Sequence, residues 1–187
     1  MQQPLIAQAD DSVLVVIDLQ ERLAAAMPEQ VRERVLSCVE IMLTATEMLS
    51  VPVMATEQYP KGLGHTEPRL KPYLDERVSV IEKTCFSCQT IPLFSQQLSA
   101  TQRKQVFLVG MEAHICVLQT AMDLQANGYQ VFVIEDAVSS RAQSNHDNAM
   151  HRLRQAGVVV TNVESVIFEW LRDASHSQFK ALSRLIV

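Results

Sequence analysis

The sequence of 187 residues lacks the features that would indicate a membrane protein or a nucleic-acid-binding protein. No apolar stretch reaches the roughly 18 residues that a membrane-spanning helix needs. There is no run of Lys or Arg, and the formal net charge is -5 at pH 7, so no basic surface for a nucleic acid or an anionic membrane is predicted. We therefore expect neither partner, and favour a small molecule or another copy of the chain.

The sequence also lacks a secretion signal and a metal-binding pattern. Residues 1–12 have neither the basic start nor the apolar core of a signal peptide, so we expect a cytoplasmic protein with reduced cysteines. Cys38, Cys85, Cys88 and Cys116 form no paired zinc-knuckle spacing and the histidines are scattered, so neither a metal nor a cofactor is expected. The close Cys85–Cys88 spacing favours packing or site lining, with a redox pair as the alternative.

Short, nearly continuous apolar runs are the main pattern that is present. Because they do not alternate with polar residues, they predict strands buried on both faces, as in a parallel sheet covered by helices. Apolar residues at helical spacing predict helices between them. This order implies right-handed crossovers in a three-layer α/β/α sandwich, with residues 1–187 as a single domain. The predicted strands are 13–17, 51–54, 78–81, 106–109, 131–134 and 158–160, and the predicted helices are 31–49, 115–126 and 148–156.

Two segments depart from this alternation. Residues 57–75 contain three prolines and two glycines and no periodicity, and a loop of this length is often functional. Since it follows a strand, we expect it to lie over the carboxyl edge of the sheet. Residues 163–187 predict one or two helices whose apolar end packs on the body of the protein or on a neighbouring subunit.

Three polar residues follow predicted strands. Asp18 follows the first strand, Lys83 the third and Cys116 the fourth. Ligands of open parallel sheets bind at the carboxyl ends of the strands, so these groups could meet at one edge. By position alone, however, Asp18 could be a turn former, Lys83 a solvated side chain, and Cys116 an inert core residue, as we expect of Cys38.

Together the three groups would suit covalent acyl transfer to water without a metal. Lys83 and the free N–H groups of a helix start would stabilise a Cys116 thiolate, and Asp18 would act as general base and acid. Backbone N–H groups from His114 to Cys116 would bind the oxyanion. We expect His114 to shape the turn, with a role as base as the alternative, and we keep His65 as a candidate substrate contact.

Four ordered motifs resemble those of the isochorismatase-like cysteine hydrolases. Residues 15–20 (Val-Val-Ile-Asp-Leu-Gln) resemble the opening D-x-Q motif, and residues 82–87 (Glu-Lys-Thr-Cys-Phe-Ser) the K-x-x-F-S motif. Residues 109–121 are similar to the G-x-x-x-x-x-C-V-x-x-T-A nucleophile turn, and residues 136–141 to the D-A-x-S stretch. The resemblance spans about residues 13–168.

This resemblance implies a Rossmann-like six-stranded parallel sheet, a triad of Asp18, Lys83 and Cys116, and a homo-oligomer. It also implies an oxyanion hole around Ala113, His114 and Ile115, with a cis peptide bond at Ala113–His114. The nicotinamidase branch carries an Asp-x-His metal motif after the second strand, which residues 55–60 lack. The loop over residues 57–64 is most similar to the uncharacterised branch that bacteria and eukaryotes share.

We therefore expect a metal-independent cysteine hydrolase of a small amide, imide or related carbonyl compound. Members that hydrolyse the vinyl ether of isochorismate commonly lack the cysteine, so its presence favours attack on an amide-like carbonyl, and vinyl-ether hydrolysis is kept as an alternative. A binding or scaffold protein that retains the fold is a second alternative. Gln20, Tyr59 and Phe86 are the residues that we expect to line the substrate pocket.

Overall fold

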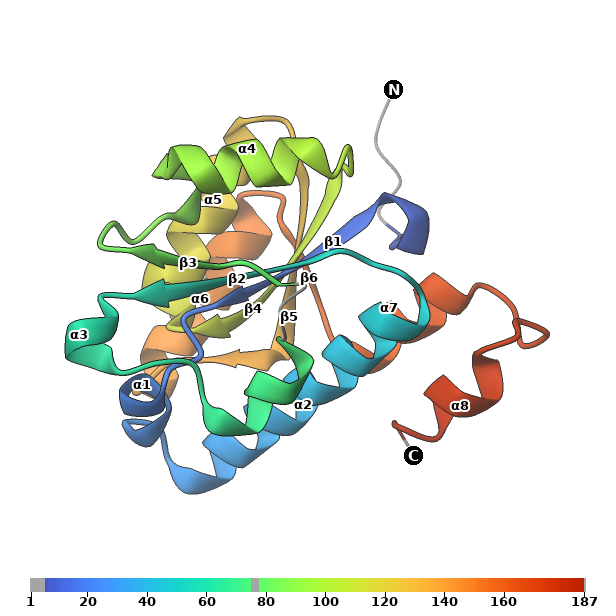
Figure 1. The fold of residues 1–187 in the computed structure, drawn as a ribbon, viewed down its shortest axis with the longest axis horizontal. Coiled ribbons are helices and arrows are strands. Elements are labelled where there is room, and N and C mark those ends of the chain that lie inside the picture. The colour runs from blue at the N-terminus through green and yellow to red at the C-terminus, as the bar shows by residue number, and fades with distance from the viewer. Residues whose placement is uncertain (1–5, 75–77, 187) are drawn as a thin grey trace.

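The fold is seen in a computed structural model, which describes residues 6–74 and 78–186 (Figure 1). The first five residues of the segment predicted to lack a secretion signal lie outside this description. So do Asp75, at the end of the predicted loop, and Val187, at the end of the predicted tail.

All six predicted strands are present in one parallel sheet, in the order β3-β2-β1-β4-β5-β6. In β1, Leu14 and Val16 pack into one apolar cluster, and Val13, Val15 and Ile17 into the other. Both faces of the strand are therefore buried, which is why the sequence shows a continuous apolar run. The strands are β1 (Ser12–Ile17), β2 (Val53–Gln58), β3 (Val80–Lys83), β4 (Gln105–Met111), β5 (Gln130–Ser139) and β6 (Val159–Thr161).

Helices cover both faces of the sheet, so the predicted three-layer α/β sandwich is confirmed. The long helix α2 (Glu29–Met48) and α7 (Val163–Leu171) lie on one face, and α4 (Pro92–Ala100), α5 (Leu118–Ala126) and α6 (Gln143–Gln155) on the other (Figure 1). The short elements are η1 (Ala9–Asp11), α1 (Glu21–Ala25), α3 (Pro60–Leu63), η2 (Pro68–Tyr73), η3 (Cys88–Thr90), η4 (Ala113–Val117) and α8 (Phe179–Ser183).

The predicted loop over 57–75 is shorter and more ordered than its composition indicates. Glu57 and Gln58 extend β2, and α3 and η2 occupy much of the remainder. The strand continues through polar residues because their groups are paired: the Gln58 N–H donates to Gln20 Oε1 at 2.7 Å, and the Glu57 carboxylate accepts from Thr66. A strand end that hydrogen bonds between polar groups stabilise cannot be recognised from an apolar pattern.

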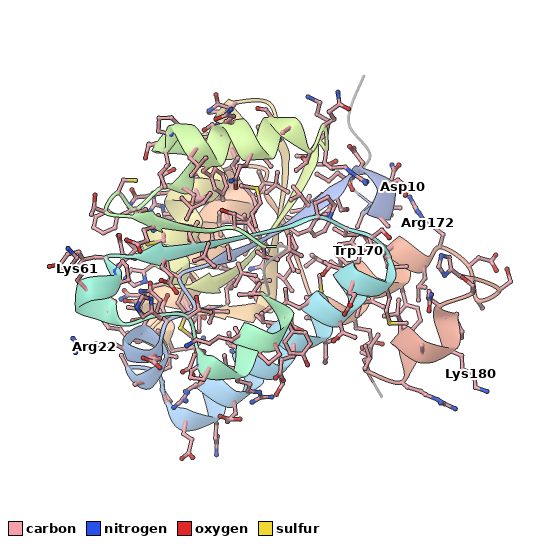
Figure 2. The ribbon with its side chains drawn as sticks, viewed as in Figure 1. Asp10, Arg22, Lys61, Trp170, Arg172 and Lys180 are labelled. Carbon is pink, nitrogen blue, oxygen red and sulfur yellow. The ribbon has the colours of Figure 1, made fainter. Side chains whose placement is uncertain are left out.

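The C-terminal segment packs on the body of the protein. Leu182 of α8 is fully buried in the cluster that α2 and α7 share. Trp170 of α7 points inward, where its indole Nε1 donates to Ser12 Oγ at 2.9 Å, whereas Lys180 points to solvent (Figure 2). Of the two arrangements predicted for the tail, packing on the body is therefore present. Within the described ranges, no helix has the length and apolarity to cross a bilayer.

Candidate active site

The carboxyl ends of β1 and β4 lie side by side at the centre of the sheet, where the strand order changes direction. Asp18 follows β1 directly, and Cys116 lies in the turn that follows β4. Such a switch point forms the crevice in which open parallel sheets bind ligands. Lys83, the last residue of β3, reaches across β2 to the same place, so the structure brings the three predicted catalytic residues together.

Asp18 is fully buried and is held by the neighbouring strand β2. Its backbone has a φ of 49°, in the left-handed region, which turns the chain out of the strand. The Asp18 N–H donates to the Thr56 carbonyl oxygen at 3.1 Å, and the Thr56 hydroxyl donates to Asp18 Oδ1 at 2.7 Å. Thr56 thus contacts both the backbone and the carboxylate of Asp18.

The Lys83 ammonium is buried and saturated with partners. It donates to Asp18 Oδ2 at 2.6 Å, to the carbonyl oxygens of Cys85 and Phe86 at 3.3 Å each, and to Cys116 Sγ at 3.5 Å. Burial acts to lower the pKa of Lys83, but the charge of Asp18 and the nearby Cys88 and Cys116 sulfurs outweigh burial and raise it. Lys83 is therefore a fixed cation and not a solvated side chain.

The surroundings of Cys116 disfavour the thiolate form of its side chain. Burial, followed by the negative charge of Asp18, raises the pKa of Cys116 from an ordinary 9.0 to about 12, although Lys83 acts to lower it. This direction opposes the expected stabilisation of a thiolate by Lys83. The main reason is burial of the sulfur, and the Lys83 ammonium bonds more closely to Asp18 than to the sulfur. A reaction of this sulfur would therefore need a nearby base, and the Asp18 carboxylate is the candidate.

The nucleophile turn differs from the predicted helix start. Cys116 lies in the π-helical turn η4, where the Val117 N–H donates to the Glu112 carbonyl oxygen at 3.3 Å. The cis peptide bond found among the described residues is Met111–Glu112, so its predicted place at Ala113–His114 was wrong by two residues. It lies where β4 ends, and Ala113 already belongs to the turn. The Ile115 N–H donates to the Glu112 carbonyl oxygen at 3.0 Å, which makes Ala113 and His114 better oxyanion candidates than Ile115.

A second group of polar side chains lies beside this turn. Glu112 is buried, and its carboxylate accepts from Arg141 Nη1 at 2.7 Å and from the Arg141 N–H at 3.1 Å. His114 contacts Ser140 Oγ through Nδ1 at 2.9 Å and Asn145 through Nε2 at 3.4 Å. Both ring nitrogens thus have partners away from the sulfur, which favours the turn-shaping role of His114. We call these five residues the Glu112 cluster.

Sequence reasoning missed two of the groups that organise the site. Thr56 enters the sequence analysis only within residues 55–60, the segment compared with a metal motif, and Glu112 only within the nucleophile motif. The signal for Thr56 was a hydroxyl residue directly before two polar residues, Glu57 and Gln58, in an otherwise apolar strand. We call Asp18, Thr56, Lys83, Cys88 and Cys116 the Asp18 cluster.

The residues predicted to line the pocket have different environments. Gln20 is fully buried, and its Nε2 donates to the carbonyl oxygens of Gln58 and Gly64, which assigns it to holding the loop. Tyr59 and Phe86 are 55% and 51% exposed, so both are accessible to a ligand. The Tyr59 ring lies against Gly62, where an added Cβ would come within 2.4 Å of it.

Other residues of the predicted loop over 57–75 also contact neighbouring side chains. His65 Nδ1 lies 3.0 Å from Glu57 Oε2, and its side chain is largely exposed, which leaves the predicted substrate contact open. Arg22 of α1 donates to the Gly62 carbonyl oxygen. Figure 2 shows Arg22 and Lys61 of α3 at the same end of the molecule, where α1 and α3 meet.

The remaining cysteines are free thiols. Cys88 is buried, its N–H donates to Thr120 Oγ1 at 3.0 Å, and its Sγ donates to Thr56 Oγ1 at 3.8 Å, which supports site lining over a redox pair with Cys85. Burial raises the pKa of Cys38 to about 11. No group of three or more His, Cys, Asp or Glu side chains in residues 6–74 and 78–186 could hold a metal.

Comparison with known proteins identifies the family. The model of the Isochorismatase domain matches residues 12–165, which spans most of the chain. The chain belongs to the isochorismatase family. The match covers β1 through β6 and includes Asp18, Lys83 and Cys116.

Three relatives show how widely this form of the family is distributed. The human isochorismatase domain-containing protein 2 is 41% identical over 179 residues, which cover 94% of this chain and 82% of the human protein. The secreted isochorismatase effector Isc1 of Phytophthora sojae is 40% identical over 182 residues, which cover 94% and 84%. The solved structure of the MAR1 ribonuclease from Caenorhabditis elegans is 39% identical with a TM-score of 0.90, covering 97% of this chain and 92% of that one.

Proposed function

We propose that this isochorismatase-family protein is a metal-independent cysteine hydrolase of a small amide, imide or related carbonyl compound. The observation that carries the proposal is the direct contact of a thiol, a carboxylate and an ammonium group in one buried site. Lys83 Nζ lies 2.6 Å from Asp18 Oδ2 and 3.5 Å from Cys116 Sγ. A packing role alone would not require two charged groups beside a buried thiol, because burying charge is costly.

In the first half of the reaction, Asp18 accepts the Cys116 proton as the sulfur attacks the carbonyl carbon. A tetrahedral intermediate forms, and N–H groups of the Ala113–His114 segment bind its oxyanion. Collapse of the intermediate breaks the carbon–nitrogen bond. The leaving amine takes the proton from Asp18, and the acyl group remains on Cys116 as a thioester.

In the second half, Asp18 removes a proton from water as the water oxygen attacks the thioester carbon. The carbon–sulfur bond breaks, a carboxylic acid is released, and the proton returns through Asp18 to Cys116. Lys83 stays bound to Asp18 and keeps the carboxylate ionised between the two steps. The positive charge of Lys83 thus compensates the buried negative charge throughout.

A second candidate function is cleavage of RNA, which the name of the 39% identical C. elegans protein favours. The formal net charge of -5 opposes it, since RNA-binding surfaces are usually basic. The vinyl ether of isochorismate and a purely binding role are the further alternatives that the family suggests. All of these require a different use of the Asp18 cluster.

We further propose a single domain over residues 1–187, a homo-oligomer, and a cytoplasmic location. The single sheet and its two helix layers support the first. The second rests on the family resemblance, and the third on the four cysteines, which are free thiols as in a reducing compartment. The name of the Phytophthora relative describes a secreted protein, so location is not uniform among relatives.

Alkylation by iodoacetamide tests the proposed nucleophile. Cys38 is more exposed than Cys116, and the pKa of Cys38 is raised to about 11 against about 12 for Cys116, so acidity and access alone predict faster alkylation of Cys38. The proposal predicts the reverse near pH 7, because Asp18 takes the thiol proton. Peptide mass mapping of the wild type and of Asp18→Asn measures both rates, and Asp18→Asn should abolish the preference.

Turnover identifies the substrate class. A panel of small amides, imides, esters, vinyl ethers and a short RNA is incubated with the wild type and with Cys116→Ser. We expect release of an amine from an amide or imide, and we expect intact mass measurement to show a thioester adduct on Cys116.

Two outcomes would contradict the proposal. Alkylation of Cys116 no faster than that of Cys38 would overturn the nucleophile assignment. Activity on RNA alone that survives Cys116→Ser would favour the ribonuclease.

A further inference from the structure

We propose that Thr56 is a positioning residue that holds the Asp18 carboxylate in the orientation that accepts the Cys116 proton. Cys88 in turn orients the Thr56 hydroxyl. This deepens the proposed function and rests on it. Thr56 lies in β2 and pairs in register with Ile17 of β1 and Ile81 of β3. These residues come one before Asp18 and two before Lys83, so Thr56 lies between the two charged groups.

The Thr56 contacts fix both ends of Asp18. Its carbonyl oxygen accepts from the Asp18 N–H, and its hydroxyl donates to Asp18 Oδ1 at 2.7 Å. The other carboxylate oxygen, Oδ2, then faces the Lys83 ammonium, which also donates to Cys116 Sγ. The oxygen and the sulfur that exchange the proton therefore share one ammonium group. Loss of the Thr56 bond would leave the carboxylate held on one side only.

Cys88 keeps the Thr56 hydroxyl pointing at Asp18. Its Sγ donates to Thr56 Oγ1 at 3.8 Å, and burial raises the pKa of Cys88 to about 11, so the thiol retains its hydrogen near neutral pH. A hydroxyl that accepts from the thiol turns its own hydrogen to the carboxylate. The bonds therefore run in one direction, from Cys88 through Thr56 to Asp18.

This arrangement predicts a change in pH dependence when Thr56 is altered. The groups that face Asp18 are Thr56 on β2, Lys83 on β3, Cys88 on η3 and Cys116 on η4. A hydroxyl donor stabilises the ionised carboxylate. Without it, the carboxylate loses the donor to Oδ1 and keeps only Lys83 on Oδ2, so the acidic limb of a reaction that uses this carboxylate as a base is expected to move upward.

The test measures the rate of Cys116 alkylation by iodoacetamide from pH 5 to pH 9 in four proteins. For Thr56→Val we expect a rate at pH 7 about tenfold below that of the wild type, from the loss of a hydrogen bond to a charged group, and an acidic limb about one pH unit higher. Thr56→Ser should restore both. Thr46→Val is the matched control, since Thr46 is buried and its hydroxyl donates only to the Leu43 carbonyl oxygen.

The inference is overturned if Thr56→Val and Thr46→Val behave alike with an unchanged limb, or if Thr56→Ser fails as Thr56→Val does. If Thr56→Val does not fold, Cys88→Ala is measured instead, because it leaves Thr56 and Asp18 in place. We expect the acidic limb of its pH profile to move upward by less than one pH unit. An unmoved limb would overturn the inference. Failure of the proposed function is distinct: it leaves wild-type Cys116 alkylated no faster than Cys38.

Discussion

The Asp18 cluster and the Glu112 cluster lie on neighbouring strand ends, and both contain an ion pair, but water reaches them differently. The side chains of Asp18 and Lys83 are fully buried. In the Glu112 cluster the carboxylate is 5% exposed, whereas the Arg141 side chain is 60% exposed. The first pair has only protein groups around it, and the second has solvent on one side.

This difference in exposure suits the two clusters to different roles. A buried pair has strong electrostatic effects, and its partners shift each other's protonation. A pair with one exposed member is screened, so it is suited to holding a turn in place at modest energy. We infer that the Asp18 cluster accepts and donates protons, while the Glu112 cluster fixes the position of the η4 turn. Three predictions test this contrast.

Replacing Lys83 by Met is expected to have the largest effect on stability. It leaves the Asp18 carboxylate buried without its cation, at a cost of about 3–5 kcal/mol in the free energy of unfolding. Urea denaturation at pH 7 measures it. The double variant Asp18→Asn with Lys83→Met should recover much of the loss, because the buried charge is gone. A double variant as unstable as the single one would argue against a charged Asp18.

The pH dependence of stability is expected to show the next largest effect. Since burial and the charge of Asp18 raise the pKa of Cys116 to about 12 from 9.0, the unfolded chain loses the thiol proton at lower pH than the folded one. The stability contributed by the protonated thiol is present below pH 9 and is lost as pH rises toward about 12. The slope for one group reaches about 1.4 kcal/mol per pH unit.

The comparison of wild type with Cys116→Ser isolates this slope, because Cys38 and Cys88 titrate in both proteins. Urea denaturation at pH 8 and pH 10 should show a greater loss for the wild type, on the order of 1 kcal/mol. An equal loss in the two proteins would mean that folding does not raise the pKa of Cys116, and a smaller loss for the wild type would mean that Cys116 is already ionised in the folded state.

The smallest effect is expected in the Glu112 cluster. Replacing Arg141 by Gln removes an exposed guanidinium, so the free energy of unfolding should fall by about 1 kcal/mol or less. Alkylation of Cys116 should slow because the η4 turn loses the contact between Glu112 and the Arg141 side chain. The acidic limb of its pH profile should not move. A shifted limb would instead assign Arg141 to proton handling, and the contrast between the clusters would fail.

How much of this could be predicted depends on the range of the interaction. The apolar runs predicted all six strands, and the positions of Asp18, Lys83 and Cys116 after three of these strands predicted that they meet at one edge. The end of β2 was missed because Gln20 pairs with Gln58 across 38 residues. The resting state of Cys116 was missed because it depends on burial and on which partner Lys83 bonds more closely.

The sequence by itself determined the α/β sandwich and the candidates for catalysis, because apolar periodicity and the order of short motifs are local properties of the chain. Only the tertiary structure decided how those candidates contact one another. The Lys83–Asp18 contact joins residues 65 positions apart and the Lys83–Cys116 contact residues 33 apart. Distances, burial and proton positions at such separations follow from strand register and helix packing, which no local pattern encodes.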